Sequence, residues 1–428
     1  MGKTAIRTAI DVGTTKVCTV VADISDRTSL RVLGTGVVHS QGMHKGMVVS
    51  INEVKDSIRE SVKIAEMSSG HKVSSAYVGV SGNHIGSLNN HRMVTISRSD
   101  RLVCRDDLLK VLASAQNIDV SSDKQLLHVL PRSYSLDGQP GMKNPVGMYG
   151  SRLDLETHII TAAVTSVKNL VKCVRGARVE VDGLAFSSLA SSEAVLTEHE
   201  RELGVIVADI GGGTTDIAIF KDGSVCHTAV LPVGGYQLTR DISISLGLPT
   251  NVAEVAKKKY ANVADDFCGE QQDPVSLAIE NGYNIMHQDL YEVVRARMEE
   301  ILKLIVMEMP RSEYVNMVPT GLVLSGGTST LPGLTEMAQE MLQIPVRVGA
   351  PRNIQGLADS LYAPAYATSV GLLAWGLKND EEMLKLGGKR SFMSKLFSKM
   401  RRPPRPDKNQ SYNSGSAKGG RNESDNSR

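Results

Sequence analysis

The sequence has few of the residues that mark disulfide-bonded, secreted or membrane-spanning proteins. Only five of its 428 residues are cysteine, and no two of them form a Cys-x-x-Cys pair. Such sparse cysteines indicate reduced thiols in a cytosolic protein and argue against a disulfide framework or a cysteine metal site. The N-terminus has no apolar segment typical of a secretory signal, and no stretch is long and apolar enough to span a bilayer.

The chain also lacks an excess of either charge. Its 48 basic and 46 acidic residues leave a net charge of +2. This balance gives no reason to expect a nucleic-acid partner, because such partners usually require a basic face. Apolar residues make up 41% of the chain, as in soluble globular proteins. At this length we expect two or more domains.

What the sequence does have is a turn rich in glycine and threonine that occurs twice. Residues 207–220 read VADIGGGTTDIAIF, and residues 9–23 read AIDVGTTKVCTVVAD. Both copies run from a strand through Asp-x-Gly and Thr-Thr into a second strand. Two copies of one pattern predict a duplicated fold whose halves face each other.

Hydrophobic periodicity outlines the rest of the chain. It predicts helices at 52–69, 106–116, 166–177, 189–203, 289–309 and 364–378, and a buried strand at 321–325. Between residues 84 and 165 we expect one helix and three short strands, RMVTIS (92–97), KQLLHVL (124–130) and DLETHIITAAV (154–164). Residues 403–428 have almost no apolar side chain and are expected to be disordered, because they bury too little surface to offset their ordering entropy.

Two glycine-rich turns that face each other could clamp the phosphates of one nucleotide. Glycine lets backbone amides approach an anion, and threonine hydroxyls add donors. Asp11 and Asp209 would hold a hydrated Mg²⁺, which prefers carboxylate and water oxygens. Lys16, placed where the second copy has Asp216, would offset phosphate charge. A pair of hairpin turns without a ligand is the alternative, but it does not account for three consecutive glycines, the paired aspartates and the duplication.

Two further patterns are ambiguous from the residues alone. The run from Ser325 to Thr328 follows a strand and is either a binding loop or an ordinary turn. Glu254 and Lys257 share one face of a helix. They either hydrogen-bond two ribose hydroxyls or form a solvent-exposed ion pair.

The order of these motifs resembles that of the superfamily of sugar kinases, heat-shock-70 proteins and actin. Within it, the sequence resembles the FtsA family of bacterial actin-like division proteins. The matches are specific in combination and cover most of residues 6–378. They are GMVVSINE (46–53), SVKIAEMSSG (61–70), YVGVSGNHI (77–85), SLASSEAVLTEHERELGVIVADIGGGTTDIAIF (188–220), VGGYQLTRDISISLG (233–247) and LSGGTSTLPG (324–333).

The resemblance implies an α/β fold, which is a duplicated actin-like ATPase with two lobes around a nucleotide cleft and an inserted small α+β subdomain. We expect a first lobe from 1–83 and 166–203, the insertion at 84–165, a second lobe from 204–234 and 309–378, a helical subdomain at 235–308, a linker at 379–390, an amphipathic helix at 391–402 and a disordered basic tail at 403–428.

The resemblance also implies that ATP and Mg²⁺ bind in the cleft. The residues that match the family's site are Asp11, Gly13, Thr14, Thr15 and Lys16 for the first phosphate loop, Asp209, Gly211, Gly212, Gly213, Thr214, Thr215 and Asp216 for the second, Glu254 and Lys257 for ribose, and Gly326, Gly327 and Thr328 for adenosine. Asp11 and Asp209 would hold Mg²⁺ through water.

The sequence departs from many ATP-hydrolysing relatives at one position. They carry Glu or Gln before the helix that leads into the second half, where this residue orients water. Here the stretch is Phe186-Ser187-Ser188, and the first carboxylate is Glu193. Without a base to position water, we expect slow hydrolysis and assign no catalytic residue.

The segment SFMSKLFSKMRR at 391–402 predicts a helix that binds the membrane. Its apolar face comprises Phe392, Met393, Leu396, Phe397 and Met400, and its basic residues are Lys395, Lys399, Arg401 and Arg402. Such a helix lies in the membrane interface and favours anionic lipid, although a helix docked on the protein's own core has the same pattern. The FtsA family is tethered by a C-terminal amphipathic helix, usually at the very end of the chain.

The resemblance therefore implies an ATP-binding adaptor that tethers the FtsZ ring to the cytoplasmic face of the membrane at the division site and can polymerise. The segment 235–308 would bind the C-terminal peptide of FtsZ, with Arg295, Arg297 and Glu300 as candidate contacts. The insertion at 84–165 would bind other division proteins. The alternatives are a PilM-type pilus-assembly ATPase, which usually lacks the C-terminal helix, and a sugar- or acetate-kinase-like enzyme, which would need a catalytic carboxylate beside its substrate.

Overall fold

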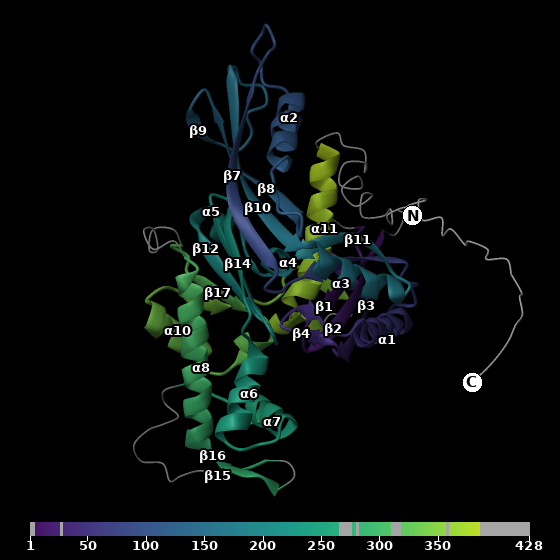
Figure 1. Ribbon diagram of the computed structural model, residues 1–428, viewed down its shortest axis with the longest axis vertical. Coiled ribbons are helices and arrows are strands. Elements are labelled where there is room, and N and C mark those ends of the chain that lie inside the picture. Colours follow the sequence, from purple (N-terminus) through teal and green to yellow (C-terminus); the bar gives the residue numbers. More distant parts are fainter. Residues whose placement is uncertain are drawn as a thin grey trace, which may run out of the picture. The chain divides into compact units, whose positions relative to one another are not determined.

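The computed structural model describes residues 5–25, 29–264, 276–279, 282–309, 318–356 and 359–385. The chain divides into two units, Met1–Asp380 and Glu381–Arg428. All the sheets described below belong to the first unit (Figure 1). The predicted amphipathic helix at 391–402 and the tail at 403–428 lie outside the described residues. Among the helices that are described, none has the length and apolar character needed to cross a membrane.

The N-terminal half is built on a six-stranded mixed sheet. β1 pairs antiparallel with β2 and in parallel with β6. The strand order is β11 (Glu180–Phe186), β6 (Ser75–Val80), β1 (Ile6–Val12), β2 (Lys16–Asp23), β3 (Leu30–His39) and β19 (Ile354–Gly356). α1 (Ile51–Ser69) and α3 (Val164–Gly176) pack side by side against this sheet, which buries the apolar stripe that predicted α1.

The C-terminal half repeats this arrangement in a five-stranded sheet. β12 pairs antiparallel with β13 and in parallel with β17, just as β1 pairs with β2 and β6. The strand order is β14 (Ser224–Leu231), β13 (Thr215–Lys221), β12 (Val205–Ile210), β17 (Leu322–Ser325) and β18 (Val346–Val348), and α10 (Leu334–Leu342) packs near β18. The duplication predicted from the repeated turn is confirmed.

Two helices connect the halves. α4 (Ser187–Val195) is almost entirely buried because it contacts strands of both sheets. α11 (Ala367–Lys385) passes it so closely that a Cβ atom on Gly371 would collide with the carbonyl oxygen of Ala190. The 3-10 turns Asp359–Tyr362 and Pro364–Tyr366 precede α11, so the helix predicted at 364–378 begins later and ends later than expected.

An antiparallel four-stranded sheet is inserted between β6 and α3. Its order is β7 (Ile85–Thr95), β10 (Arg152–Ala163), β8 (Lys124–Leu136) and β9 (Gln139–Met142), with α2 (Arg105–Gln116) packed against it. Three of these strands have 11 to 13 residues, so the expectation of short strands is wrong. The strand predicted at 92–97 covers only the end of β7, because the earlier residues of β7 are exposed or half-exposed and show no alternating apolar pattern.

The insert rests on the edge of the second sheet. The Ser87 hydroxyl of β7 donates to the carbonyl oxygen of Thr228 in β14 at 2.8 Å, and the Asn89 amide donates to that of Cys226 at 3.2 Å. His158 of β10 lies between them, 2.7 Å from Asn89 Oδ1 and 2.9 Å from Thr228 Oγ1. The insert is therefore continuous with the first half in sequence and is also hydrogen-bonded to the second.

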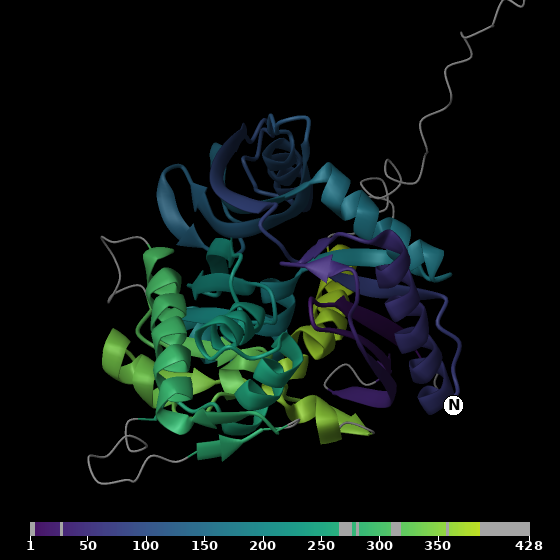
Figure 2. The same cartoon turned by 60° about the horizontal axis from the view of Figure 1, so that its bottom comes forward.

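The segment between β14 and β17 is mainly helical, as predicted. It contains α6 (Gly235–Ser245), α7 (Thr250–Tyr260) and α8 (His287–Met307), together with the two-stranded sheet of β15 (Ser276–Ala278) and β16 (Asn284–Met286). α6 packs against both α7 and α8, and Figure 2 shows α8 as the long green helix at the left, on the opposite side of the view from the purple helix α1.

The single helix predicted at 189–203 is wrong, because the chain breaks it at Thr197. α4 ends at Val195, and α5 (Glu198–Leu203) begins after a reciprocal cap. The Thr197 hydroxyl accepts from the Glu200 amide at 3.2 Å, and the Glu200 carboxylate accepts from the Thr197 amide at 2.8 Å. This capping box satisfies amides that would otherwise lack partners, so it starts a new helix.

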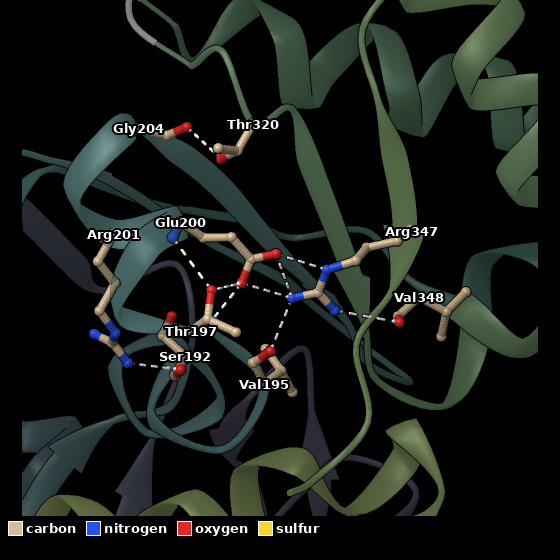
Figure 3. Close-up of polar contacts among 9 residues, drawn as sticks. All are labelled: Ser192, Val195, Thr197, Glu200, Arg201, Gly204, Thr320, Arg347 and Val348. Carbon is tan, nitrogen blue, oxygen red and sulfur yellow. Dashed lines mark hydrogen bonds and ion pairs between the residues drawn. The ribbon is translucent and has the colours of Figure 1, made fainter.

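Glu200 also connects α5 to β18 through an ion pair with Arg347 (Figure 3). Its carboxylate accepts from Arg347 Nε at 2.7 Å and from Arg347 Nη2 at 2.9 Å, and Nη2 also donates to the carbonyl oxygen of Val195. Burial by itself would raise the pKa of Glu200, but the hydrogen bonds from Arg347 and Thr197 outweigh it and lower the pKa to about 2. Bidentate arginine–carboxylate pairs of this kind are stronger than ion pairs with one hydrogen bond.

Arg347→Met should therefore lower the free energy of unfolding by about 1–2 kcal/mol at pH 7. The folded-state pKa lies below the ordinary value of 4.5, so the contribution of Glu200 is present above pH 4.5 and disappears as the pH falls toward 2. Urea unfolding of variant and wild type should show a difference that shrinks across this range.

The matched control is Lys143→Met, which removes the more exposed ion pair of Lys143 with Glu202. This control should change stability little at any pH. A difference between Arg347→Met and wild type that is the same at pH 7 and pH 2.5 would contradict the assignment.

Candidate functional site

The two predicted turns have the same local geometry. In each, the amide of the glycine two residues after the aspartate donates to a carbonyl oxygen three residues later, Gly13 to Lys16 and Gly211 to Thr214, both at 2.9 Å. The turns join β1 to β2 and β12 to β13 at equivalent places in the two sheets. The sequence repeat is therefore a structural repeat.

The strand register corrects the expected match between the copies. Asp11 lies opposite Cys18, and Asp209 lies opposite Asp216. The residue equivalent to Asp216 is therefore Cys18, and Lys16 is equivalent to Thr214. The expected match aligned the Thr-Thr pairs of the two copies. The turns have equal lengths, but the threonines of the second turn lie two residues further along it, so that alignment was wrong by two residues.

The turns contact each other across the two halves. A Cβ atom on Gly213 would come within 2.6 Å of Thr14 Oγ1, and a Cβ atom on Gly212 would collide with the side chain of Thr15. Real Cβ atoms do not approach other atoms this closely, so these glycines are required by the opposite turn. The expectation that the turns face each other is confirmed.

The two aspartates are fixed by adjacent residues at the start of α11. Thr368 Oγ1 donates to Asp209 Oδ2 at 2.6 Å, and Ser369 Oγ donates to Asp11 Oδ2 at 3.1 Å. One helix thus holds one carboxylate from each half. Sequence reasoning missed these hydroxyls, since a Thr-Ser pair in the first turn of a helix is typical of ordinary capping.

A third carboxylate is fixed by a residue that the sequence also left unassigned. Ser81, directly after β6, donates to Asp216 Oδ1 at 2.6 Å, and its hydroxyl lies 3.1 Å from Thr214 Oγ1. Ser81 belongs to the first half, whereas Asp216 and Thr214 belong to the second. It is therefore a second link between the halves beside the turns.

Asp209 and Asp216 are buried and Asp11 is half-buried, and none of the three has a full counter-charge. Burial is the main cause that raises the pKa of Asp11, of Asp209 to about 6, and of Asp216 well above its ordinary value. Lys16 lowers the pKa of Asp11, but its ammonium is hydrogen-bonded to the carbonyl oxygen of Ala365 and lies 3.9 Å from the centre of the Tyr366 ring. The site therefore has an excess of negative charge that a bound cation would relieve.

Helix α7, which carries Glu254 and Lys257, lies beside the second turn. Lys257 Nζ donates to Glu254 Oε2 at 2.6 Å, to Thr239 Oγ1 at 2.8 Å and to the carbonyl oxygen of Gly235 at 3.0 Å. The amide of Gly235 in turn donates to the carbonyl oxygen of Gly211 at 2.9 Å. This pair is part of an internal network, which disfavours the alternative of a solvent-exposed ion pair.

Gly326 and Gly327, which follow β17, also lie beside the second turn. Gly326 has φ +83°, and a Cβ atom there would come within 2.5 Å of the carbonyl oxygen of Ile210. Thr328 Oγ1 donates to the carbonyl oxygen of Gly211 at 3.2 Å, from the 3-10 turn Gly327–Thr330. The structure thus brings four separate sequence motifs together around one turn.

The predicted partner contacts lie elsewhere, on α8. Arg297 Nε donates to Asp241 of α6 at 2.5 Å and its guanidinium also pairs with Glu300, while Arg295 donates to the Tyr291 hydroxyl at 2.7 Å. The predicted membrane residues at 391–402 are outside the described part of the chain.

The donor set suits Mg²⁺ and a phosphate group better than a metal bound by protein alone. Among the described residues there is no cluster of three or more His, Cys, Asp or Glu side chains that could enclose a metal ion. Two carboxylates with water and phosphate oxygens are the ligands that Mg²⁺ usually takes. The bare glycine amides and hydroxyls of the two turns suit phosphate.

Asp209→Asn should stabilise the protein in EDTA without nucleotide. A pKa of about 6, above the ordinary 3.8, means that the folded state holds this proton more tightly, so stability is lost as the pH rises through 6. We expect a gain of about 1–3 kcal/mol at pH 7.5 and none at pH 4, measured by urea unfolding. Asp23→Asn, at the exposed end of β2, should give no gain. Loss of stability in Asp209→Asn at pH 7.5 would refute the interpretation.

Comparison with solved structures shows a shared fold at low sequence identity. The structure of a PilM-PilN type IV pilus biogenesis complex matches with a TM-score of 0.61 and 15% identity, covering 87% of this chain and 98% of that chain. Spiroplasma citri MreB5 bound to ADP matches with a TM-score of 0.54 and 11% identity, covering 90% of this chain and 99% of that chain. These likenesses confirm the actin-like fold.

Comparison with protein families and curated proteins is more specific. A family model described as "Cell division protein FtsA" matches residues 206–371, and one described as "SHS2 domain inserted in FTSA" matches residues 82–161. The FtsA proteins of Pseudomonas aeruginosa and Escherichia coli K12 are 41% and 37% identical, over 88% and 86% of this chain and 90% and 89% of their own lengths. The chain therefore belongs to the FtsA family of actin-like cell division proteins.

Proposed function

We propose that this member of the family is an ATP- and Mg²⁺-binding adaptor that tethers the FtsZ ring to the cytoplasmic face of the membrane at the division site and forms filaments. The observation that supports nucleotide binding best is the pair of contacting turns, with Asp11 and Asp209 fixed beside them by Ser369 and Thr368. Backbone amides, hydroxyls and carboxylates in one place suit a phosphate group together with its cation.

In this proposal each part of the site has one task. The amides and threonine hydroxyls of the two turns hold phosphate oxygens, and Asp11 and Asp209 hold Mg²⁺ through water. Glu254 and Lys257 bind the ribose hydroxyls. Gly326, Gly327 and Thr328 form the floor for adenosine. Bound Mg²⁺ would supply the positive charge that the buried carboxylates and the phosphates need.

We propose that hydrolysis is slow, because the site lacks an uncommitted base to orient water. Glu193, the first carboxylate after β11, is paired with Arg201 at 3.3 Å and with Lys378 at 3.1 Å. Ser187 stands closer to the turns, in the same neighbourhood as Gly79 and Asp11. A serine with an ordinary hydroxyl is a poor general base. The bound nucleotide then controls conformation and assembly.

The adaptor role has two further parts. The segment 391–402 binds anionic lipid through its apolar face and basic residues. The region of α6 and α8 binds the C-terminal peptide of FtsZ at Arg295, Arg297 and Glu300. Since Arg297 is already bonded to Asp241, an acidic peptide would compete with that aspartate for the guanidinium group. Division partners other than FtsZ would use the insert.

The two alternatives are less consistent with these findings. The PilM relative shares the fold at 15% identity, whereas the FtsA proteins are up to 41% identical over most of the chain. A sugar- or acetate-kinase-like enzyme would need a free catalytic carboxylate, and Glu193 is held in two ion pairs.

Purified protein should bind one ATP in the presence of Mg²⁺ and release phosphate far more slowly than the about 10 per second typical of enzymes. Calorimetric titration would measure binding, and a phosphate-release assay would measure turnover. Asp11→Asn should weaken ATP binding at least tenfold because the hydrated Mg²⁺ loses one of its two negatively charged partners, whereas Lys63→Gln on the exposed side of α1 should not. Enzyme-like turnover would refute slow hydrolysis, and failure of the wild type to bind ATP would refute the proposed site.

Deletion of residues 391–402 should abolish co-sedimentation with vesicles that contain anionic phosphatidylglycerol. The lipid contact is lost, whereas ATP binding by the folded unit remains. In the same assay, the FtsZ tail peptide should sediment with vesicles coated by the wild type. Arg297→Glu should release the peptide but not the protein. Continued sedimentation of the deletion variant would refute the membrane anchor.

A further inference from the structure

A small hairpin lies against the first phosphate turn, and its tip carries a lysine that the local backbone does not favour. β4 (Met43–His44) pairs with β5 (Met47–Val48), so Lys45 and Gly46 form a two-residue turn. Both have positive φ, 47° for Lys45 and 75° for Gly46, as in a type I′ turn. Asparagine, aspartate or glycine usually occupies the first position, because other residues pay about 1 kcal/mol or more for a left-handed conformation.

The tip of this hairpin is attached to the candidate nucleotide site. The Gly46 amide donates to Thr14 Oγ1 at 3.1 Å, and a Cβ atom on Gly46 would come within 2.9 Å of Gly82. The neighbour of Gly82 is Ser81, which bonds Asp216. The backbone of Lys45 is therefore held directly beside the first turn, where the two halves meet.

The hairpin also contacts the second half. The rings of His44 and Tyr236 are arranged edge to face, with centroids 6.2 Å apart. The Tyr236 amide donates to the carbonyl oxygen of Gly212 in the second turn at 2.6 Å. The hairpin also packs against α3, and Met43, Gly46, Met47 and His84 line part of a small cavity beside it. The hairpin is thus positioned by its bond to the first turn, by the contact of His44 with Tyr236 and by packing against α3.

The ammonium group of Lys45 has no partner among the described residues, unlike the ammonium groups of Lys16 and Lys257. Lys257 is bonded to Glu254, and Lys16 is bonded to the carbonyl oxygen of Ala365. Over the described ranges of the chain, the Lys45 ammonium has neither an ion-pair nor a hydrogen-bond partner. A lysine has a flexible four-carbon stem, so its ammonium can reach an anion held at the turn to which its own backbone is attached.

We propose that Lys45 is a phosphate-binding residue of this site, which contacts the terminal phosphates of a nucleoside triphosphate held between the two turns. This inference rests on the proposed function and adds a specificity element to it. The ribose and adenosine motifs are clustered around Gly211 of the second turn, whereas Lys45 is attached at Thr14 of the first. Lys45 should therefore distinguish ATP from AMP and leave recognition of the nucleoside unchanged.

The decisive variant is Lys45→Gly, because glycine suits the left-handed position better than lysine and so preserves the hairpin. We expect ATP affinity in Mg²⁺ to fall about tenfold, which corresponds to about 1.4 kcal/mol. AMP affinity should stay within about twofold, and the salt dependence of ATP binding should weaken. The melting temperature without nucleotide should be equal to or above that of the wild type.

Two controls separate this role from others. Lys45→Arg keeps the charge and should retain most of the ATP affinity, while Lys63→Gln removes a distant lysine and should have no effect. Equal ATP affinity of Lys45→Gly and wild type would overturn the inference and leave the proposed function intact. An equal loss for ATP and AMP would also overturn it, because that pattern indicates a distorted hairpin. Failure of the wild type to bind ATP would refute the proposed function itself.

Discussion

The site depends on one arrangement, in which a single helix holds one aspartate from each half of a duplicated fold. Thr368 and Ser369 are neighbours in α11, so Asp209 and Asp11 cannot separate unless a hydrogen bond breaks or the helix moves. The turns beside these aspartates touch, and Ser81 adds a further bond across the halves. The relative position of the two sheets is thus fixed where a phosphate group and its cation would bind.

The run of three glycines has two physical causes. Backbone without side chains can approach an anion. Independently, Gly212 and Gly213 leave the space that Thr15 and Thr14 of the opposite turn occupy. Any larger residue at either position would separate the halves even if no nucleotide were present. Close packing between the turns and the proposed phosphate binding therefore favour the same sequence.

The parts of the fold that the sequence predicted are those with a strong local signal. α1 follows from its apolar stripe, and the two turns follow from their glycines and threonines. Only the end of β7 could be predicted, because its first part is held by pairing with β10 and by contacts with β14, which are distant in the sequence. The capping box of Thr197 and Glu200 encodes the break in the helix, but the helical spacing of apolar residues on both sides of Thr197 predicted one continuous helix. At the site, Ser81, Thr368 and Ser369 are short polar residues whose role appears only when their partners are brought near.

The sequence by itself determined the motifs of the candidate site, which are the paired aspartates, the glycine-rich turns, the Glu-x-x-Lys helix and the strand-ending glycines, since each motif is local in the chain. Tertiary structure alone decided how they are matched and oriented. It set the register that makes Lys16 equivalent to Thr214, brought Glu254 and Lys257 to the second turn, and set the Lys45 hairpin on the first. These relations depend on strand pairing and on packing between residues far apart in the chain, which local periodicity does not encode.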